Sequence, residues 1–205
     1  GPVLLEQSLP IGLHDNATTL AARLSALTAA LLVEALPRIA AAGPGPELER
    51  WRRLKVRPQA QEGINYARLL QREDQRIDWG SSALAVHRRI QGLHPGAFAL
   101  WRGKRLKLLA SEPLVRRLAK TLGPEGLSPE ARALAERWGL AEGEASAAAP
   151  GTVLAVEKEL GLVVATGGCP LLLREAQLEG KPAAAGGRLL QQLGATVGEQ
   201  LRNGS

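Results

Sequence analysis

The chain has 205 residues, of which 45% are hydrophobic, and it carries a formal net charge of +6. This hydrophobic content excludes wholesale disorder, and the length fits one medium domain or two small ones. A single cysteine, Cys169, excludes a framework of intrachain disulfide bonds and favours a reducing, cytoplasmic compartment. Charged residues interrupt every long apolar run, so we expect no membrane-spanning segment and no membrane partner.

The positive charge is concentrated in the middle of the chain. Residues 50–120 contain 17 Lys and Arg against five Asp and Glu, whereas each flank is mildly acidic. A basic centre between acidic flanks favours a polyanionic partner more than a uniformly high isoelectric point would. A solvated basic face with no partner is the alternative.

The first predicted elements are a strand and a long helix. Apolar residues alternate over residues 3–11, which predicts a strand with two partly apolar faces. Asp15 or Asn16 then caps a helix that runs to about Ala42, and Pro37 is expected to kink or shorten it. Together they form half of an α/β layer, so we expect them to need neighbouring strands that this segment does not supply.

The motif Gly43-Pro44-Gly45-Pro46 marks a boundary. The segment that follows, to about residue 65, is predicted to be a solvated linker. It is interleaved with Trp51 and carries the basic residues Arg50, Arg52, Arg53, Lys55 and Arg57.

From about residue 66 the pattern changes to short strands with a helix among them. Ser81 or Ser82 is predicted to cap a helix that ends near Gly92, and residues 113–149 read as a helical insertion followed by a loop. Short strands around a helix favour a small β-barrel of the oligonucleotide-binding (OB) type. The strands are expected at residues 97–101, 105–110, 153–156, 162–165 and 171–174, with a last short helix at 187–193.

Asp78 and Trp79 are interpreted as structural. Trp79 is expected to anchor the core, and Asp78 to accept hydrogen bonds near the helix start. No nucleophile, general base or phosphate-binding loop is recognised near them, so we predict no catalytic residue. The soft metal ligands lack the spacing of a zinc site, which makes a metal site improbable. They are His14, His87, His94 and Cys169.

The basic residues are therefore the candidate site. Alternation places Arg105 and Lys107 on one face of a strand, beside a hairpin turn, and further pairs stand at Arg88-Arg89 and Arg116-Arg117. Few aromatic side chains are available for stacking, so contact with the phosphates of a helical RNA stem is favoured over reading of unpaired bases. Solvation without a ligand is the alternative for each residue. The candidate RNA-binding residues are Arg50, Arg52, Arg53, Lys55, Arg57, Arg88, Arg89, Arg102, Lys104, Arg105 and Lys107.

Several short motifs follow one another in a specific order. Arg76-Ile77-Asp78-Trp79 precedes His94-Pro95-Gly96-Ala97-Phe98, and Pro150-Gly151-Thr152-Val153-Leu154 precedes Gly161-Leu162-Val163-Val164-Ala165-Thr166-Gly167. Leu178-Glu179-Gly180-Lys181 closes the set. This order resembles the C-terminal domain of methionyl-tRNA formyltransferases, and the resemblance extends over essentially the whole chain.

The resemblance implies an α+β organisation. Residues 1–42 would be the last strand and helix of an incomplete Rossmann-like formyltransferase domain, because Gly1-Pro2-Val3-Leu4 resembles the continuation of the family's Asp-x-Gly-Leu-Asp-x-Gly motif. Residues 43–65 would be a basic interdomain linker. Residues 66–205 would be an OB-like barrel that helps to bind tRNA, with the insertion at about 113–149.

The resemblance also implies the chemistry. Family enzymes transfer a formyl group from 10-formyltetrahydrofolate to the amino group of initiator methionyl-tRNA, in translation initiation. The family's catalytic Asn, His and Asp, and its folate-binding segment, align before residue 1. The resemblance therefore gives this chain a tRNA partner and no catalytic, folate-binding or metal-binding residue. We expect the chain alone to be inactive, and the full-length enzyme to be a cytoplasmic monomer.

Three departures from the family pattern make transfer of individual RNA contacts unsafe. Gln91-Gly92-Leu93-His94-Pro95 stands in place of an Arg-Ala-Phe-x-Pro-like turn, and Thr166-Gly167-Gly168-Cys169 replaces a Gly-Asp-Gly turn. The insertion at 113–149 is longer than in most members. One alternative is another folate-dependent formyltransferase or hydrolase acting on a small substrate, such as a nucleotide sugar. A second is a stand-alone RNA-binding barrel. The basic centre argues against the first, and the two-sided apolar strand argues against the second.

Overall fold

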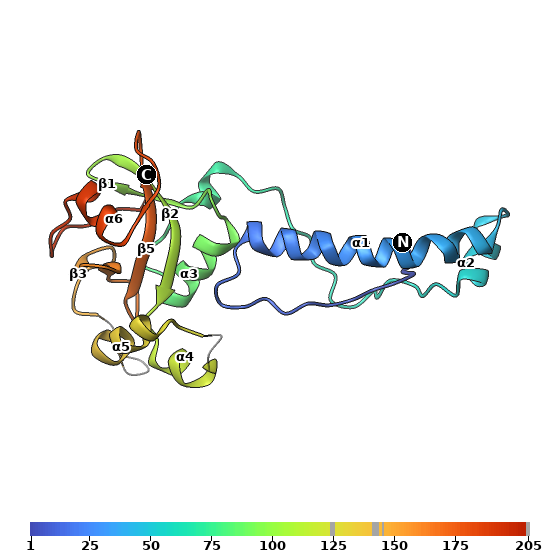
Figure 1. The fold of residues 1–205 in the computed structure, drawn as a ribbon, viewed down its shortest axis with the longest axis horizontal. Coiled ribbons are helices and arrows are strands. Elements are labelled where there is room, and N and C mark those ends of the chain that lie inside the picture. Colours follow the sequence, from blue (N-terminus) through green and yellow to red (C-terminus); the bar gives the residue numbers. More distant parts are fainter. Residues whose placement is uncertain (124–125, 141–143, 145, 204–205) are drawn as a thin grey trace. The chain divides into compact units, whose positions relative to one another are not determined.

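The computed structural model describes residues 1–123, 126–140, 144 and 146–203. The chain divides into two compact units (Figure 1). The N-terminal unit contains residues 1–11 and 18–69, and the C-terminal unit contains residues 12–17 and 70–205. The short segment 12–17 thus packs with the later part of the chain.

The N-terminal unit is built around the helix α1 (Ala17–Ala42), which confirms the long helix predicted from the sequence. Pro37 lies inside this helix and does not shorten it. The strand predicted at residues 3–11 is wrong. Only Val3 is paired, with Arg57, through two backbone hydrogen bonds of 2.8 and 3.0 Å. A strand needs a neighbour that continues the ladder, and residue 57 supplies a single bridge.

The predicted linker contains a helix of its own, α2 (Glu47–Leu54), which the sequence pattern did not predict. It ends where Lys55 adopts a left-handed conformation, with φ of 54°. Tyr66 and Leu69, at the predicted start of the barrel domain, are 92% and 85% exposed. The compact C-terminal unit resumes at Leu70.

The helix α1 is apolar around most of its circumference. Leu20, Leu27 and Leu31 are half-buried, whereas Val33 and Leu36 on the opposite side are 71% and 54% exposed. A stretch of 18 residues within it has a mean hydropathy of 1.5, so by length and composition the helix is able to cross a membrane. This differs from our expectation. One such helix is weak evidence for a membrane span, because core helices of soluble proteins and signal sequences meet the same criterion, although no residue of this stretch is buried.

The C-terminal unit contains a mixed α/β fold with an antiparallel sheet. The sheet order is β1-β2-β5-β4-β3, with β6 paired to β5 (Figure 1). All five predicted strands are confirmed, and β2 and β5 are longer than expected. The strands are β1 (Phe98–Trp101), β2 (Lys104–Pro113), β3 (Val153–Glu157), β4 (Gly161–Val164), β5 (Leu171–Leu178) and β6 (Ala184–Ala185).

Among the described residues, five helical segments accompany the sheet. The helices α3 and α6 confirm two predictions, and α4 and α5 form the helical part of the insertion. Residues 124–125, 141–143 and 145, within the predicted insertion, lie outside the described residues. The segments are η1 (Arg72–Gln75), α3 (Ala83–Gly92), α4 (Arg116–Thr121), α5 (Pro129–Trp138) and α6 (Gly186–Leu193).

The sheet is open, because its edge strands β1 and β3 do not pair with each other. The C-terminal segment is hydrogen-bonded to both edges instead. Leu100 and Arg202 exchange two backbone hydrogen bonds of 3.0 and 2.9 Å, and the N–H of Val153 donates to the carbonyl of Glu199 at 2.8 Å. A barrel closed by strand ladders is thus not confirmed, and single bridges span the gap.

Both faces of the central strands are buried. Leu171 and Leu173 of β5 point into the larger core with Trp79, whereas Leu172 points into a second core formed with α5. The uninterrupted apolar runs of β4 and β5 follow from this double burial. Helices α3 and α6 contribute side chains to the larger core. Trp79 is 1% exposed, which confirms its predicted role as a core anchor.

The entry to α3 also matches its prediction. Asp78 accepts hydrogen bonds from the N–H of Gly80 at 3.0 Å and from the hydroxyl of Ser81 at 3.1 Å. Ser82 is the N-cap, and its hydroxyl accepts from the N–H of Ala85 at 3.3 Å. The N–H of Gly167 donates to the carbonyls of Trp79 and Ser81, both at 2.9 Å, which joins the β4–β5 turn to this entry.

Gly167 and Gly168 should respond differently to substitution by alanine. A Cβ at Gly167 would overlap the carbonyl oxygen of Gly80, whereas a Cβ at Gly168 meets nothing within 4 Å. We expect Gly167→Ala to lower the free energy of unfolding by about 2 kcal/mol or more, and Gly168→Ala to change it by less than about 0.5 kcal/mol. Urea denaturation measures both. Equal destabilisation of the two variants would contradict the close approach.

Candidate nucleic-acid interface

Arg102, one of the predicted RNA-binding residues, is held by the protein itself. It lies in the β1–β2 turn with φ of 47°. Its Nε and Nη2 donate to the two carboxylate oxygens of Glu199, both at 2.9 Å, and its guanidinium lies 5.0 Å from the ring centroid of Trp101. Hydrogen bonds from Thr196 first, and from Arg102, lower the pKa of Glu199. The charge of Arg102 is therefore largely compensated locally.

Two more predicted cations have structural partners. Arg105 is half-buried: its guanidinium lies 4.2 Å from the ring centroid of Phe98, and Nη2 donates to Oε1 of Gln75 at 3.1 Å. Arg89 donates from Nε and Nη2 to the carbonyl oxygen of Asp74 at 3.0 and 2.7 Å. Both side chains therefore help to hold the segment around η1 against the sheet and α3.

Arg88, Lys104 and Lys107 are different. Arg88 and Lys104 are exposed and Lys107 is half-buried. Their side chains make no hydrogen bond or ion pair with any residue that the structure describes. The burial pattern of β2 places Lys107 on the same side as Arg105, with Leu106 and Leu108 facing the core, which confirms the predicted alternation. These three cations are available to a ligand.

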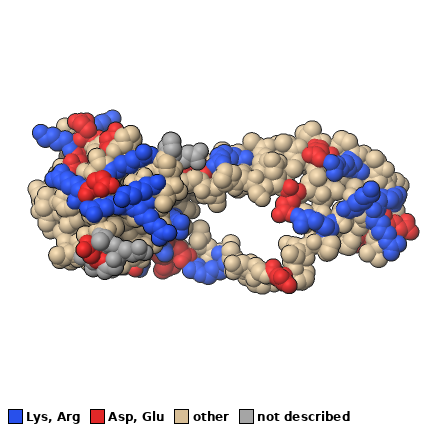
Figure 2. Space-filling model, turned by 90° about the horizontal axis from the view of Figure 1, so that it is seen from below, with Lys and Arg blue, Asp and Glu red and all other residues tan. Residues whose placement is uncertain are grey.

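The five predicted cations of the N-terminal unit are also divided. Arg57 forms an ion pair with Glu6, Nη2 of Arg53 donates to the carbonyl oxygen of Pro44 at 3.0 Å, and Arg50 is half-buried. Arg52 and Lys55 are exposed and, together with Trp51 and several apolar residues, line a hollow of about 500 Å³. Each of the two units thus presents its own group of Lys and Arg (Figure 2).

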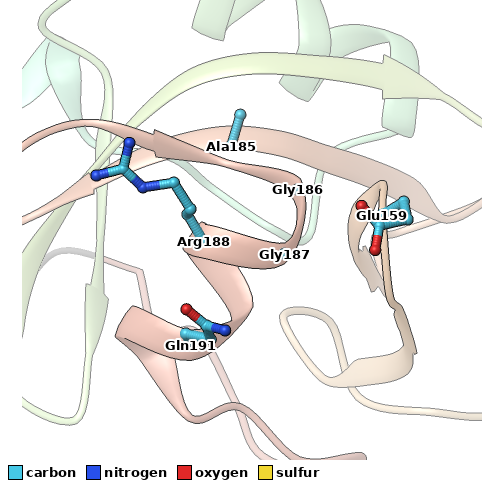
Figure 3. A pocket seen from close by; sticks show the side chains of 6 residues that line it. All are labelled: Glu159, Ala185, Gly186, Gly187, Arg188 and Gln191. Atoms are coloured by element: carbon cyan, nitrogen blue, oxygen red, sulfur yellow. The ribbon is translucent and has the colours of Figure 1, made fainter.

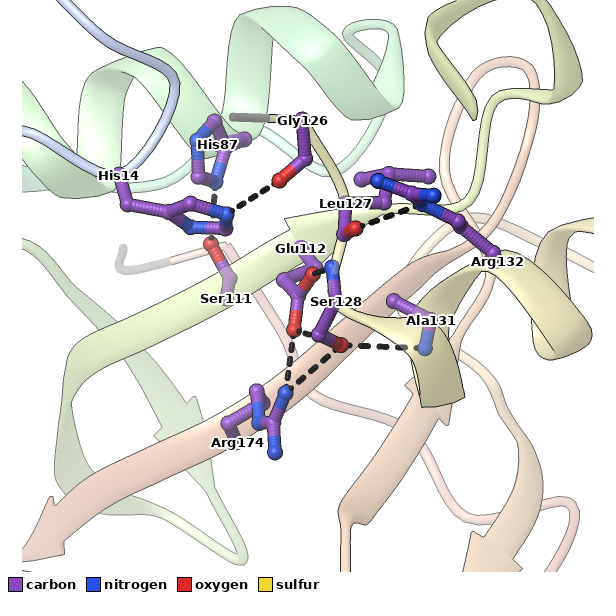
Figure 4. Close-up of polar contacts among 10 residues, drawn as sticks. All are labelled: His14, His87, Ser111, Glu112, Gly126, Leu127, Ser128, Ala131, Arg132 and Arg174. Atoms are coloured by element: carbon purple, nitrogen blue, oxygen red, sulfur yellow. Dashed lines mark hydrogen bonds and ion pairs between the residues drawn. The ribbon is translucent and has the colours of Figure 1, made fainter. Parts of the chain in front are cut away.

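A buried polar network lies inside the C-terminal unit (Figure 4). Glu112 is 2% exposed and forms an ion pair with Arg174. The backbone N–H and the hydroxyl of Ser128 donate to its carboxylate at 2.7 and 2.8 Å. These bonds connect β2, β5 and the start of α5. These contacts satisfy a carboxylate that would be costly to bury without partners.

His87 belongs to the same region. It is 1% exposed, with Nδ1 3.1 Å from the hydroxyl oxygen of Ser111 and Nε2 2.8 Å from the carbonyl oxygen of Leu13. The side chain of Gln91 donates to the carbonyl oxygen of His14 at 3.0 Å. These contacts attach the segment 12–17 to the C-terminal unit. Burial lowers the pKa of His87, with an opposing contribution from the Leu13 carbonyl.

No constellation of catalytic groups is seen in the part of the chain that the structure describes. Within that part, no three His, Cys, Asp or Glu side chains gather as metal ligands. A hollow at the start of α6 has a volume of about 500 Å³ and is lined by Glu159, Gly186, Gly187 and Arg188 (Figure 3). It contains a carboxylate and a cation but no nucleophile or histidine.

Comparison with known proteins identifies the class to which this fold belongs. Residues 69–194 match the family model described as "Formyl transferase, C-terminal domain". The chain therefore belongs to the formyl transferase family, as the order of its motifs indicates.

Curated proteins that are similar to this chain carry the name methionyl-tRNA formyltransferase. The protein of Synechococcus sp. strain RCC307 is 59% identical over 194 residues, which cover 94% of this chain and 55% of that protein. The protein of strain CC9605 is 53% identical over 98% of this chain and 56% of its own length. The protein of Parasynechococcus marenigrum strain WH8102 is 54% identical over 95% of this chain and 54% of its own length. The chain thus spans about half the length of the curated relatives it matches.

Protonation of His87 should destabilise the C-terminal unit at acidic pH. Its pKa is lower in the folded protein than in the unfolded chain, where it is about 6.5, so the unfolded chain binds the proton more readily. The contribution of neutral His87 is complete above that pH and is lost as the pH falls through the folded-state pKa. We expect the Tm to fall between about pH 7.5 and pH 5, and His87→Gln to flatten this dependence.

Ser111→Ala is the matched control for this experiment. It removes the hydroxyl that contacts Nδ1 of His87 but retains the imidazole. It should lower the Tm at every pH and keep the acidic decline. A decline that is equally steep in wild type and His87→Gln would exclude His87 as its source.

The held and available cations of β2 should differ in their effect on stability. Arg105→Gln removes a stack on Phe98 and a hydrogen bond to Gln75, which we expect to cost about 1–2 kcal/mol of unfolding free energy. Lys107→Gln, on the same face, should cost less than about 0.5 kcal/mol. Chemical denaturation of both variants checks the difference. The reverse order would mean that the two side chains have been assigned the wrong roles.

Proposed function

We propose that this chain is the C-terminal part of a methionyl-tRNA formyltransferase and contributes to binding of the initiator tRNA. The observation that carries this proposal is the similarity to relatives of that name, at 50 to 59% identity over almost the whole chain. The reaction would be transfer of a formyl group from 10-formyltetrahydrofolate to the amino group of methionyl-tRNA, in the cytoplasm. A small-substrate formyltransferase and a stand-alone RNA-binding barrel are less favoured, because the relatives named above are methionyl-tRNA formyltransferases of about twice this length.

In this proposal residues 1–42 are the end of a Rossmann-like catalytic domain, followed by the linker 43–65 and an OB-like domain over 66–205. The exposed apolar side chains of α1, such as Val33 and Leu36, support the first assignment because they suit contact with further protein. The hydrogen bonds from the C-terminal segment to β1 and β3 support the OB-like arrangement. The full-length protein would be a monomer.

The RNA contacts would be made to phosphates. Among the eleven predicted residues, Arg88, Lys104, Lys107, Arg52 and Lys55 are those whose side chains are least engaged with the protein. Held cations such as Arg102 and Arg105 would contribute mainly by shaping the surface on which the others stand. Catalytic and folate-binding groups would come from the part of the relatives that this chain does not match, so we expect no formyl transfer by the chain alone.

Binding of the chain to initiator tRNA and to an unrelated duplex RNA, titrated between about 50 and 200 mM salt, tests the proposal. We expect affinity to fall steeply with salt, with a preference for initiator tRNA. Lys104→Gln with Lys107→Gln should weaken binding to both RNAs and reduce the salt slope by about 0.7–0.9 for each phosphate that is no longer bound. The matched control is Lys158→Gln with Arg188→Gln, two exposed cations elsewhere on the C-terminal unit.

The outcomes separate the candidate functions. Binding with preference for initiator tRNA supports the formyltransferase assignment. Equal binding to both RNAs at every salt concentration favours a general RNA-binding barrel. An absence of binding even at low salt would overturn the RNA-binding role and make a small-substrate formyltransferase the better explanation.

A further inference from the structure

The helical insertion carries a hollow that the predicted interface did not include. It has a volume of about 950 Å³ and lies beside α4. Leu84 of α3 and the aliphatic residues Val115, Leu118 and Leu140 give it an apolar lining. Arg116, Arg117 and Lys120 of α4 line it too, and Glu144 adds one carboxylate, so cations outnumber acidic groups in the described lining. Its described lining contains no aromatic side chain. The hollow therefore combines an aliphatic surface with cations, without a platform for stacking a base.

The cations of α4, like those of the β1–β2 hairpin, include some that are held by the protein and some that are available. Arg116 is held, since its Nη2 donates to the carbonyl oxygen of Glu136 at 2.9 Å. Arg117 and Lys120 are exposed, and their side chains have no hydrogen bond or ion pair with the residues described by the structure. Their spacing of three residues places them on one side of the helix. Two neighbouring charges of one sign, without an ion pair among the described residues, are suited to a ligand that is a polyanion.

This hollow adjoins the proposed RNA-binding surface. Leu84, which lines it, and Arg88, one of the available cations, stand four residues apart and hence on the same side of α3. Figure 2 shows the molecule from the side on which α4 and α5 lie, and Lys and Arg side chains gather there on the C-terminal unit. Asp or Glu side chains lie among these cations in the same view. Available cations on both α3 and α4 suit a ligand that extends across the two helices.

We propose that this hollow receives the sugar-phosphate backbone of the bound RNA, with Arg117 and Lys120 contacting phosphates and a ribose lying against Leu84 and Leu118. This inference rests on the proposed RNA-binding function and gives the insertion a role in it. Backbone contact is favoured over base reading because aliphatic side chains do not stack with bases as aromatic ones do. The insertion would thus increase affinity without adding sequence preference.

The test uses a double variant that combines Arg117→Gln and Lys120→Gln. It is compared with wild type and with the control pair Lys158→Gln and Arg188→Gln. All are measured with initiator tRNA and with duplex RNA over the same salt range. We expect the double variant to lose at least about tenfold in affinity at low salt, and its salt slope to fall by about 1.4–1.8. The loss should be similar for both RNAs. The Tm should stay at the wild-type value.

A second measurement uses the wild-type protein, so that it does not depend on folding of a variant. Acetylation of lysine side chains is followed by mass spectrometry with and without tRNA. Lys120 should become protected on binding, and Lys158 should keep its reactivity. The inference is overturned if wild type binds RNA while the double variant binds equally well and Lys120 stays reactive. If wild type binds no RNA, the proposed function itself fails.

A competition experiment distinguishes RNA from an acidic protein as the ligand of the hollow. An acidic polypeptide such as poly-glutamate should displace tRNA only at much higher concentrations of charge than an unrelated RNA does. Displacement at equal charge concentrations would mean that the hollow recognises negative charge alone, which would overturn the RNA assignment.

Discussion

The central strand β5 is the element on which the C-terminal unit depends. It pairs with β2, β4 and β6, and its residues 171–173 are fully buried on both faces of the sheet. Burial of one leucine side chain stabilises the fold by about 1.5–3 kcal/mol, so these three residues supply a large share of the stability of such a unit. The β1–β2 hairpin and α3, which carry candidate basic residues of the C-terminal unit, are attached to this strand directly or through β2.

Attachment to the sheet explains why the basic residues of one hairpin have different roles. Arg102 and Arg105 contact aromatic rings and hydrogen-bond acceptors of the surrounding backbone and side chains, which fixes the hairpin. Lys104 and Lys107 stand between and beside them without partners among the described residues. Arginine suits the first role because its planar guanidinium stacks and donates in fixed directions, whereas lysine carries a point charge on a flexible stem. The hairpin thus combines a rigid frame with adaptable charges.

The sequence predicted those features that depend on local chemistry. The five strands follow from period-two patterns between turn residues, and Ser82 and Trp79 have the roles expected of a cap and a core anchor. The failures concern partners distant in the chain. The segment 3–11 has a strand-like pattern but only one bridge, because a ladder requires a neighbouring strand that local sequence does not reveal.

For the same reason, the sequence could not show which cations are held by the protein and which are available. Glu199, which compensates Arg102, is 97 residues away in sequence, and Leu13, which accepts from His87, is 74 residues away. Sequence alone also gives no reason to separate Arg117 from Arg116. Only the position of Glu136 on α5 shows that one is held and the other is available. The charge composition therefore predicts the sign of the partner's charge, and the fold determines which cations are available to it.

The helix α1 presents the remaining physical problem, since it exposes apolar side chains on the side opposite its half-buried stripe. Its charged residues help to distinguish a membrane from further protein as the environment of that side. Arg23, Glu34 and Arg38 lie along the helix, and Glu34 and Arg38 form an ion pair one turn apart. A charged residue near the centre of a bilayer costs about 2.5–3.5 kcal/mol even on insertion scales. At a protein surface the same residues remain in water while the apolar side is covered, which is the arrangement that the composition of α1 favours.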